Sequence, residues 1–409
     1  MQCFFTLMRA IHRIPPPPPP SSAFPPYVAK DFFRFEIVHQ STKSKARVGR
    51  IHTPHGVIDT PGFVPVGTNA ALKGNERGVV LMFANSYHLL LQPGPEVIRQ
   101  HGGLHTFMNR SRPIITDSGG FQVFSLAYGS VHEELKGKSS THSKYRAANP
   151  TSAVVKITEE GVVFKSYRDG RRISLTPESS VQIQKAYGAD IIIPFDELPP
   201  YHITPDKLVS RPFAVIPHSI PRSLHEHLKH VNQQAMYGVV HGGIDQRLRR
   251  MSAEYISSLP FDGHAIGGSM GKDRTEMMDL LTFLRPFLPD EKPIHLLGIA
   301  DEPSLHQCVP LGIDTFDSCF PTRAGRHGTL FSASRGGPLH VVRGKFAGDK
   351  GPIDAECACP ACTQHSVGYI HHLFKAKEPT AMMLATLHNL HYMVRLMTTF
   401  RQHILDNRI

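Results

Sequence analysis

The stretch Pro113-Ile114-Ile115-Thr116-Asp117-Ser118-Gly119-Gly120-Phe121-Gln122 joins a short apolar strand to a polar, glycine-rich exit. An acid, a hydroxyl group, two glycines and an aromatic ring pack poorly in a core. A glycine pair lets a ligand approach the backbone, and the ring that follows can stack on a flat group. The alternative is a strand-to-helix turn in which Asp117 caps the helix. Similar strand exits recur along the chain, and this repetition favours the functional interpretation.

Apolar, strand-like runs alternate with helical patterns on both sides of this stretch. Eight strands with helices between them in roughly 300 residues predict an α/β fold, a (β/α)8 TIM barrel. Chemistry in such barrels lies at the C-terminal ends of the strands. The expected strands are Gly62–Val66, Val80–Asn85, Pro113–Thr116, Asp190–Phe195, Met236–Val240, Gly263–Ile266, Ile294–Ile299 and Thr315–Phe316. The polar or glycine-rich exits are Asn85, Asp117, Asp196, His241-Gly242-Gly243, Gly267-Gly268, Gly298 and Asp317.

One connection is too long for a simple barrel. The segment from Gly129 to Thr176 contains two apolar runs, Val162–Tyr167 and Arg172–Leu175, on either side of Asp169-Gly170. Asp-Gly between two such runs is typical of a tight hairpin turn. We therefore expect a β-hairpin region inserted into the barrel.

The composition limits the classes of partner. A chain of 409 residues with 40% hydrophobic residues can bury a large core, and its formal net charge of +11 suggests a polyanionic partner. No run is long and apolar enough to span a membrane. Six cysteines in a chain of this length do not indicate a disulfide scaffold, so we expect a reducing, cytoplasmic compartment.

The first thirty residues differ from the rest. Pro15–Pro20 can neither continue a helix nor join a sheet, which predicts a solvated, extended tether. Arg9 and Arg13 precede it with no acid before Asp31, so an organelle-targeting peptide is the alternative. The expected organisation is a disordered Pro-rich extension (1–31), a barrel catalytic domain (32–340), and a zinc-binding subdomain with C-terminal helices (341–409).

Three cysteines provide a metal signal. Cys357-x-Cys359-x-x-Cys362 places three thiolates within one tight loop, which predicts a zinc site in preference to a redox cluster. A tetrahedral structural zinc needs a fourth ligand, commonly a histidine. Spacing alone leaves five downstream candidates: His365, His371, His372, His388 and His391.

Taken together, these motifs resemble the tRNA-guanine transglycosylases, also called queuine tRNA-ribosyltransferases. The resemblance covers about residues 33 to 400, and the pieces occur in the family's order. The matching pieces are Asn85-Ser86-Tyr87-His88-Leu89, Thr116-Asp117-Ser118-Gly119-Gly120-Phe121-Gln122, Phe195-Asp196-Glu197, Ala265-Ile266-Gly267-Gly268, Phe316-Asp317 with Pro321-Thr322-Arg323, the three cysteines and Leu387-His388-Asn389.

The resemblance implies a zinc-bearing (β/α)8 barrel with a defined reaction. Such an enzyme exchanges guanine at the wobble anticodon position of certain tRNAs for queuine or a 7-deazaguanine precursor. The resemblance also implies His388 as the fourth zinc ligand, in a closed structural site with one zinc per chain. The family works as homodimers or as heterodimers with a sister subunit, and the sequence does not choose between them.

The resemblance also gives roles to two carboxylates. Cleavage of a glycosidic bond with retention uses a carboxylate nucleophile and an acid/base partner for the leaving group. By the match, Asp317 is the nucleophile that holds the ribosyl carbon, and Asp117 is the general acid/base. Asp314 is the nearest rival of Asp317, but the Phe-Asp-x-x-x-Pro-Thr-Arg frame selects Asp317.

The remaining implied contacts concern the base and the tRNA. Asp196 accepts hydrogen bonds from the guanine-like edge, and Phe121 and Leu297 sandwich the base. Arg323 and Arg326 hold phosphates beside the reacting nucleotide, which must leave its stack to react. The other expected base-site residues are Asn85, which orients Asp117, together with Ser118, His241, Gly242, Gly267 and Gly268.

Three departures from the family pattern matter. His241 stands where the family usually has Gln, and Ser269-Met270-Gly271 stands where Leu usually follows the glycine pair. Leu198 stands where bacterial precursor-using members carry Cys. Gly271 and Phe121 resemble the queuine-using members, so the expected incoming base is queuine.

Four alternatives stay open at this point. An archaeal-type transglycosylase usually carries extra C-terminal RNA-binding domains, for which a chain ending at Ile409 has no room. A non-catalytic partner subunit, or a pure tRNA-binding protein, does not need Asp117 and Asp317. A metal-dependent barrel hydrolase would need His-x-His at a strand end. His225-Glu226-His227 instead lies in a helical, polar stretch that we expect to be exposed.

Overall fold

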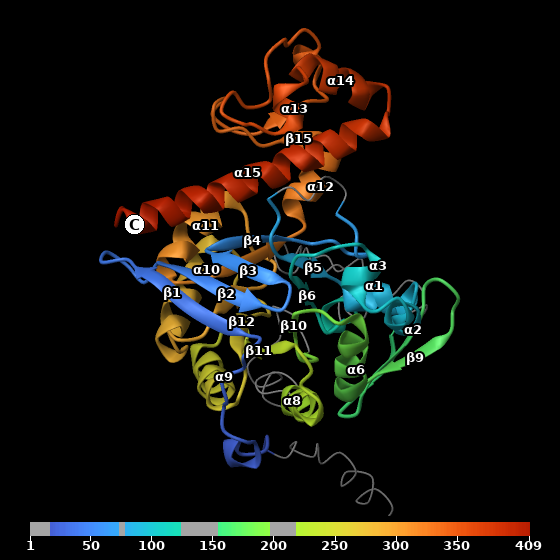
Figure 1. Ribbon diagram of the computed structural model, residues 1–409, viewed down its shortest axis with the longest axis vertical. Coiled ribbons are helices and arrows are strands. Elements are labelled where there is room, and N and C mark those ends of the chain that lie inside the picture. The colour runs from blue at the N-terminus through green and yellow to red at the C-terminus, as the bar shows by residue number, and fades with distance from the viewer. Residues whose placement is uncertain (1–16, 73–77, 124–153, 197–217) are drawn as a thin grey trace, which may run out of the picture.

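The computed structural model describes residues 17–72, 78–123, 154–196 and 218–409 (Figure 1). Eight parallel strands form one sheet in the order β4-β14-β13-β12-β11-β10-β6-β5, and a parallel bridge from Val66 to Phe83 joins the two edges. The expected (β/α)8 barrel is therefore confirmed. Its strands are β4 (Gly62–Pro65), β5 (Met82–Ala84), β6 (Ile114–Thr116), β10 (Ile191–Ile192), β11 (Ala235–Val240), β12 (Gly263–Ile266), β13 (Ile294–Leu296) and β14 (Thr315–Ser318).

Helices surround this sheet, and side-chain caps fix where several of them begin. Thr176 caps α6 through a capping box with Ser179, and Asp245 accepts a hydrogen bond from the Leu248 amide at the start of α9. The helices around the barrel are α1 (Ser86–Leu91), α2 (Pro95–Gln100), α3 (Leu104–Phe107), α6 (Pro177–Tyr187), α8 (Ser219–Lys229), α9 (Gln246–Ser258), α10 (Arg274–Leu284), α11 (Glu302–Cys308) and α12 (Phe320–Arg326). Short 3-10 turns are η2 (Ser21–Ala23), η3 (Arg285–Phe287), η4 (Val309–Leu311) and η5 (Gly344–Phe346).

Three buried aspartates lie at the N-terminal ends of barrel strands. Each sits just before a strand and accepts the backbone N–H of a residue in the neighbouring strand. They are Asp190, Asp262 and Asp314, and their partners from the N-terminal segment are His55, Lys30 and Arg47, respectively. This end of the barrel is thus closed by structural ion pairs and hydrogen bonds, which leaves chemistry to the opposite end.

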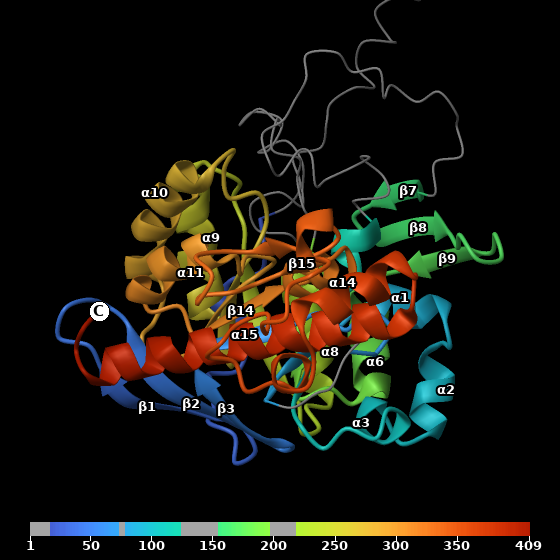
Figure 2. The same ribbon diagram turned by 90° about the horizontal axis from the view of Figure 1, so that it is seen from above.

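Two antiparallel sheets flank the barrel (Figures 1 and 2). The first joins β1 (Arg34–Gln40), β2 (Arg47–Thr53) and β3 (Gly56–Thr60), and the sequence analysis did not predict it. The second contains the expected hairpin as β8 (Gly161–Lys165) and β9 (Arg172–Leu175), with a third strand, β7 (Val154–Thr158). The inserted β-region is therefore confirmed and larger than expected.

The C-terminal part forms a second small core beside the barrel. The buried residues of this core include Leu330, Ile353 and Ile370, and they surround the three clustered cysteines. The long helix α15 packs against α12 and α14, and Figure 1 shows it between this part and the barrel. The elements are β15 (Thr329–Leu330), β16 (Leu339–His340), α13 (Pro360–Thr363), α14 (Val367–Lys375) and α15 (Pro379–Leu405).

The described part of the N-terminal extension contacts the barrel. The Tyr255 hydroxyl donates to the Pro19 carbonyl, and Lys292 lies over the Tyr27 ring at 4.3 Å. The proposed boundary at residue 31 stays a prediction. None of the described helices is both long enough and apolar enough to cross a bilayer.

One expectation about exposure is wrong. His225 is exposed on α8 as expected, but His227 is 1% exposed. The apolar face of α8, with Ile220 and Leu224, turns His227 toward the core. Burial lowers the pKa of His227 to about 3, so the ring is neutral at physiological pH. His225 thus faces solvent and His227 faces the core, so the two histidines do not form a His-x-His metal pair.

Candidate active site and metal centre

Asp117 lies at the C-terminal exit of β6 and is held by the neighbouring strand exit. Asn85 Nδ2 donates to Asp117 Oδ2 and the Ser86 amide donates to Asp117 Oδ1, both at 2.6 Å. Asn85 Oδ1 accepts a hydrogen bond from the His88 backbone amide at the start of α1. This cap orients the Asn85 side chain so that its Nδ2 faces the Asp117 carboxylate. The expectation that Asn85 orients Asp117 matches this geometry.

The environment of Asp117 changes its acidity. Desolvation is the main cause that raises the pKa of Asp117 to about 7, and the nearby Asp196 carboxylate adds to this rise. Hydrogen bonds from Ser86, Gln122 and Gly119 oppose the rise in pKa. A carboxyl group with this pKa is protonated in about half of the molecules at neutral pH. Asp117 can therefore donate a proton at one step and accept one at another.

Asp196, Ser118 and His241 form a second polar group beside Asp117. Ser118 Oγ donates to Asp196 Oδ1 at 3.0 Å, and His241 Nε2 lies 3.0 Å from Asp196 Oδ2. A Cβ on Gly120 would come within 2.3 Å of the Asp196 carbonyl oxygen, so this close approach requires glycine. The structure therefore brings together two strand exits that are 78 residues apart along the chain.

The glycine exits of β11 and β12 are joined by a buried arginine that the sequence analysis missed. The Arg249 guanidinium, 0% exposed, donates to the carbonyls of Val240, Gly243, Gly267 and Ser269 at 2.8–2.9 Å. Burial lowers the pKa of Arg249 to about 9, which still leaves it charged at neutral pH. The sequence does not predict that Arg249 holds these two strand exits together, because arginines on a helix usually lie on the protein surface.

Three further expected base contacts, Gly242, Gly267 and Gly268, lie at the exits of β11 and β12. A Cβ on Gly267 would meet Leu297 at 3.0 Å, and a Cβ on Gly268 would meet His241 Nδ1 at 3.2 Å. Gly242 has φ of +136° and packs against the backbone at Arg249. Phe121 is 45% exposed, so its ring is free to stack on a ligand. Leu198 lies outside the described residues.

Asp317, in β14, is held by two donors from the neighbouring strand exit. His295 Nε2 lies 3.1 Å from Asp317 Oδ1, and the Gly298 amide donates to the same oxygen at 2.8 Å. Thr315 Oγ1 lies 2.8 Å from His295 Nδ1 and fixes the imidazole orientation. Within the described part of the chain, hydrogen bonds fall only on Oδ1, which leaves Oδ2 for a reacting atom. The sequence pattern does not mark His295 as a site residue, because a histidine inside an apolar strand resembles a core residue.

Asp314 occupies the opposite end of the same strand. It is 1% exposed and accepts two hydrogen bonds from the Arg47 guanidinium, at 2.9 and 2.6 Å. Asp314 also accepts the Ile294 amide at 2.7 Å. All of its contacts are structural, and the geometry therefore agrees with Asp317 as the nucleophile candidate.

The two arginines expected to bind phosphate lie on α12, directly after β14. Arg323 is exposed and Arg326 is partly exposed. Asn389 Nδ2 on α15 donates to the carbonyls of Pro321, in the first turn of α12, and of Thr329, in β15 just after this helix, at 2.9 Å. The helix that carries both cations is therefore tied to α15 in its first turn and through the strand that follows it.

The cysteine cluster forms a closed tetrahedral donor set. His388 Nδ1 lies 3.7, 3.5 and 3.2 Å from the Sγ atoms of Cys357, Cys359 and Cys362. A tetrahedral zinc with ordinary Zn–S and Zn–N bonds would separate such ligands by about 3.5 Å. His391 Nδ1 approaches only Cys357, at 3.3 Å. Of the five histidines that spacing left open, His388 therefore completes the site.

The surroundings of the cluster support a structural zinc. All four ligand residues are buried, and His388 Nε2 lies 2.6 Å from the Phe331 carbonyl, which fixes the tautomer that leaves Nδ1 for metal. A closed set of four protein ligands has no position for a metal-bound water. A zinc ion held by these four residues would stabilise the subdomain and would have no open position at which to activate a water.

Carboxylates at the strand ends of a (β/α)8 barrel, beside a subdomain with a zinc-ligand set, fit the class of enzymes that break a glycosidic bond. Comparison with known proteins gives the family. The family model for queuine tRNA-ribosyltransferase matches residues 41–409. The queuine tRNA-ribosyltransferase of Protochlamydia amoebophila is 55% identical over 384 residues, which covers 92% of this chain and 97% of that protein.

Further relatives agree with this result. Queuine tRNA-ribosyltransferases of Chlamydia caviae and of Chlamydia trachomatis serovar L2 are 49% and 48% identical, and each match covers 92% of this chain and 99% of the relative. The chain belongs to the queuine tRNA-ribosyltransferase family.

Proposed function

We propose that this chain exchanges guanine at the wobble anticodon position of tRNA for queuine through a covalent ribosyl–Asp317 intermediate. One observation carries the assignment of roles: Asp117, with a pKa near 7, lies beside the Asp196 carboxylate, while the hydrogen bonds that the described residues make to Asp317 all fall on Oδ1. Asp117 and Asp196 together suit the recognition and protonation of a base. Asp317 suits nucleophilic attack on a sugar carbon.

The proposed exchange has two steps. Asp317 Oδ2 attacks the ribose C1′, the bond from C1′ to guanine breaks, and Asp117 gives its proton to the departing base. The incoming base then loses a proton to Asp117 and attacks C1′, which releases the Asp317 carboxylate. Because Asp117 ends each cycle protonated as it began, a carboxyl pKa near 7 serves both halves.

The proposed incoming base is queuine. Gly271, which resembles the queuine-using members, has φ of +125°, and a Cβ there would come within 3.0 Å of Glu276, so a larger side chain is disfavoured at this position. The test is release of labelled guanine from tRNA that carries guanine at the wobble position, with queuine or its precursors as acceptor. Release with precursor alone would contradict the choice of queuine, and no release with any acceptor would contradict the function.

The enzyme's working form and compartment are also proposals. We propose that it acts as a dimer, either of two identical chains or with a sister subunit, in the cytoplasm. Sedimentation of the purified chain with and without tRNA tests the first point.

His241 tests the assignment of the base edge. We expect His241→Ala to weaken base binding by about 1–2 kcal/mol, roughly 5- to 30-fold in the Michaelis constant for the base, because Asp196 Oδ2 loses its partner. His241→Gln can still donate a hydrogen bond and should stay within a few-fold of wild type. An unchanged Michaelis constant in the Ala variant would mean that His241 only packs against the barrel rim.

His295 tests how Asp317 is positioned. Gln places its amide nitrogen near the position of Nε2, so His295→Gln should keep the bond to Asp317, whereas His295→Leu should lose it. We expect about a 10- to 100-fold lower kcat for the Leu variant, the cost of a misplaced reacting group, and near-normal tRNA affinity. Single-turnover formation of the covalent intermediate measures this. Equal rates in the Gln and Leu variants would exclude a positioning role.

A further inference from the structure

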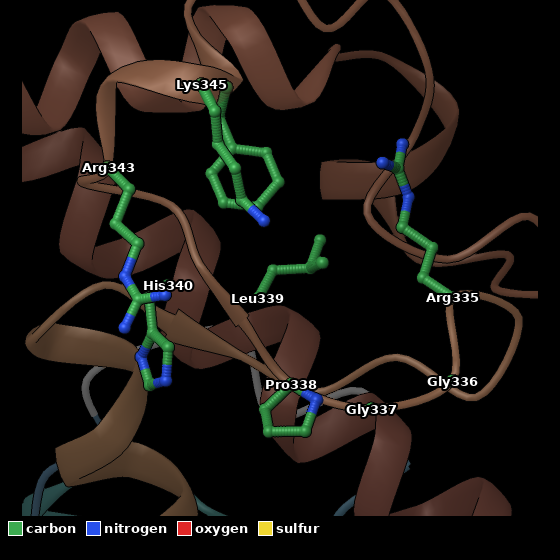
Figure 3. A pocket seen from close by; sticks show the side chains of 9 residues that line it. Arg335, Gly336, Gly337, Pro338, Leu339, His340, Arg343 and Lys345 are labelled. Carbon is green, nitrogen blue, oxygen red and sulfur yellow. The ribbon is translucent and has the colours of Figure 1, made fainter.

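A basic cavity lies on the C-terminal subdomain, away from the barrel strand ends. It has a volume of about 260 Å³ and is lined by residues between 335 and 346, in the segment that contains β16 and η5. Figure 3 shows Arg343 and His340 on one side, Lys345 above, and Arg335 on the other side. Leu339 and Phe346, both buried, supply an apolar floor.

The charges in this cavity are all of one sign. None of its described lining residues is an acid. Arg335 is neutralised by two hydrogen bonds to Asp349, at 2.6 and 3.1 Å, and forms a fixed wall. Among the residues that the structure describes, Arg343 and Lys345 have no carboxylate partner, and Lys345 lies 5.0 Å over the Phe346 ring. Two uncompensated cations therefore face a cavity large enough for a small anionic group.

The cavity continues the phosphate-binding segment of the proposed active site. Asp317 is followed by α12 with Arg323 and Arg326, and then by the β15–β16 hairpin. His340 pairs with Thr329 in this hairpin, and Thr329 Oγ1 lies 3.1 Å from His340 Nδ1, which fixes the ring beside the cavity. Along the sequence, Arg323 and Arg326 thus lie between the nucleophile and the cavity residues Arg335, Arg343 and Lys345.

We propose that this cavity binds a phosphate of the tRNA backbone outside the reacting nucleotide, with Arg343 and Lys345 as its cations. The inference rests on the proposed function, because the same tRNA must reach both places. A backbone phosphate fits better than a free nucleotide, because the cavity is an open, one-sided surface site and its apolar floor suits a ribose face. The positive net charge of the chain agrees with a polyanionic partner.

The test compares two double variants of the full-length, zinc-loaded chain. R343Q/K345Q removes the two cations. The control K375Q/K377Q removes two exposed lysines at the end of α14, in the same subdomain but outside the cavity. We expect about a 10-fold higher Michaelis constant for tRNA in R343Q/K345Q, with kcat and the Michaelis constant for the free base unchanged. The slope of log affinity against log salt should fall by about 0.7–0.9, the contribution of one phosphate contact.

Ethylation interference on the tRNA provides the second readout. Wild type and K375Q/K377Q should share one sensitive phosphate outside the anticodon that R343Q/K345Q loses. If R343Q/K345Q matches the control in affinity, salt slope and interference, the inference is overturned. A change in sedimentation in place of tRNA affinity would likewise overturn it and assign the surface to a second copy of the chain. Loss of guanine exchange in the wild type would overturn the proposed function itself.

Discussion

Asp317→Asn is expected to abolish base exchange while tRNA binding stays near normal. The amide keeps the shape of the side chain and can still contact Gly298, but it is not a nucleophile. We expect kcat to fall by at least ~1000-fold, since a covalent mechanism has no second route through the same site. Guanine release under saturating tRNA and base measures the loss, and filter binding of tRNA measures the affinity.

Asp314→Asn is the matched control on the same strand. This change breaks the buried pair with Arg47, so stability should fall by about 3–5 kcal/mol while the folded molecules keep their kcat. Exchange activity that survives in the Asp317→Asn variant but disappears in folded Asp314→Asn enzyme would reverse the two assignments.

Cys359→Ala is expected to remove the zinc and unfold the C-terminal subdomain. Cys359 is 1% exposed and contributes one of the four ligands, and metal binding supplies much of the folding free energy of such a site. We expect less than one zinc per chain by elemental analysis and a melting temperature lower by several degrees. The barrel should also lose some thermal stability, because α15 contacts both parts.

Cys319→Ala is the control for this change, since Cys319 is an exposed free cysteine outside the cluster. It should keep one zinc per chain and its melting temperature. A full zinc content with unchanged melting in Cys359→Ala would show that the ligand set is wrong.

The barrel was predictable because its strands are short apolar runs with polar exits. Asp117 and Asp317 are polar side chains where a packed strand ends, and the chain pattern marks both. Periodicity could not choose between Asp317 and Asp314, because both flank the strand that the sequence predicts, Thr315–Phe316. The structure separates them by placing the Arg47 ion pair at the closed end.

Other features gave no local signal. Arg249 and His295 act inside the protein through contacts 6–22 residues away in the chain, which a residue-type pattern does not report. The β1–β2–β3 sheet was missed because β1 is mostly exposed and lacks the alternating apolar pattern of a half-buried strand. Spacing left His388 open among five histidines, and only the fold brings its Nδ1 to three sulfurs.

The site of covalent attachment is the most direct test of the central claim. Wild-type enzyme is mixed with tRNA in the absence of incoming base, denatured, digested with protease and nuclease, and examined by mass spectrometry. The account predicts a ribosyl-nucleotide mass on the peptide that contains Asp317, and no such mass in the Asp317→Asn variant. A modification on Asp117, Asp196 or Asp314, or a denaturant-resistant adduct in the Asp317→Asn variant, would contradict it.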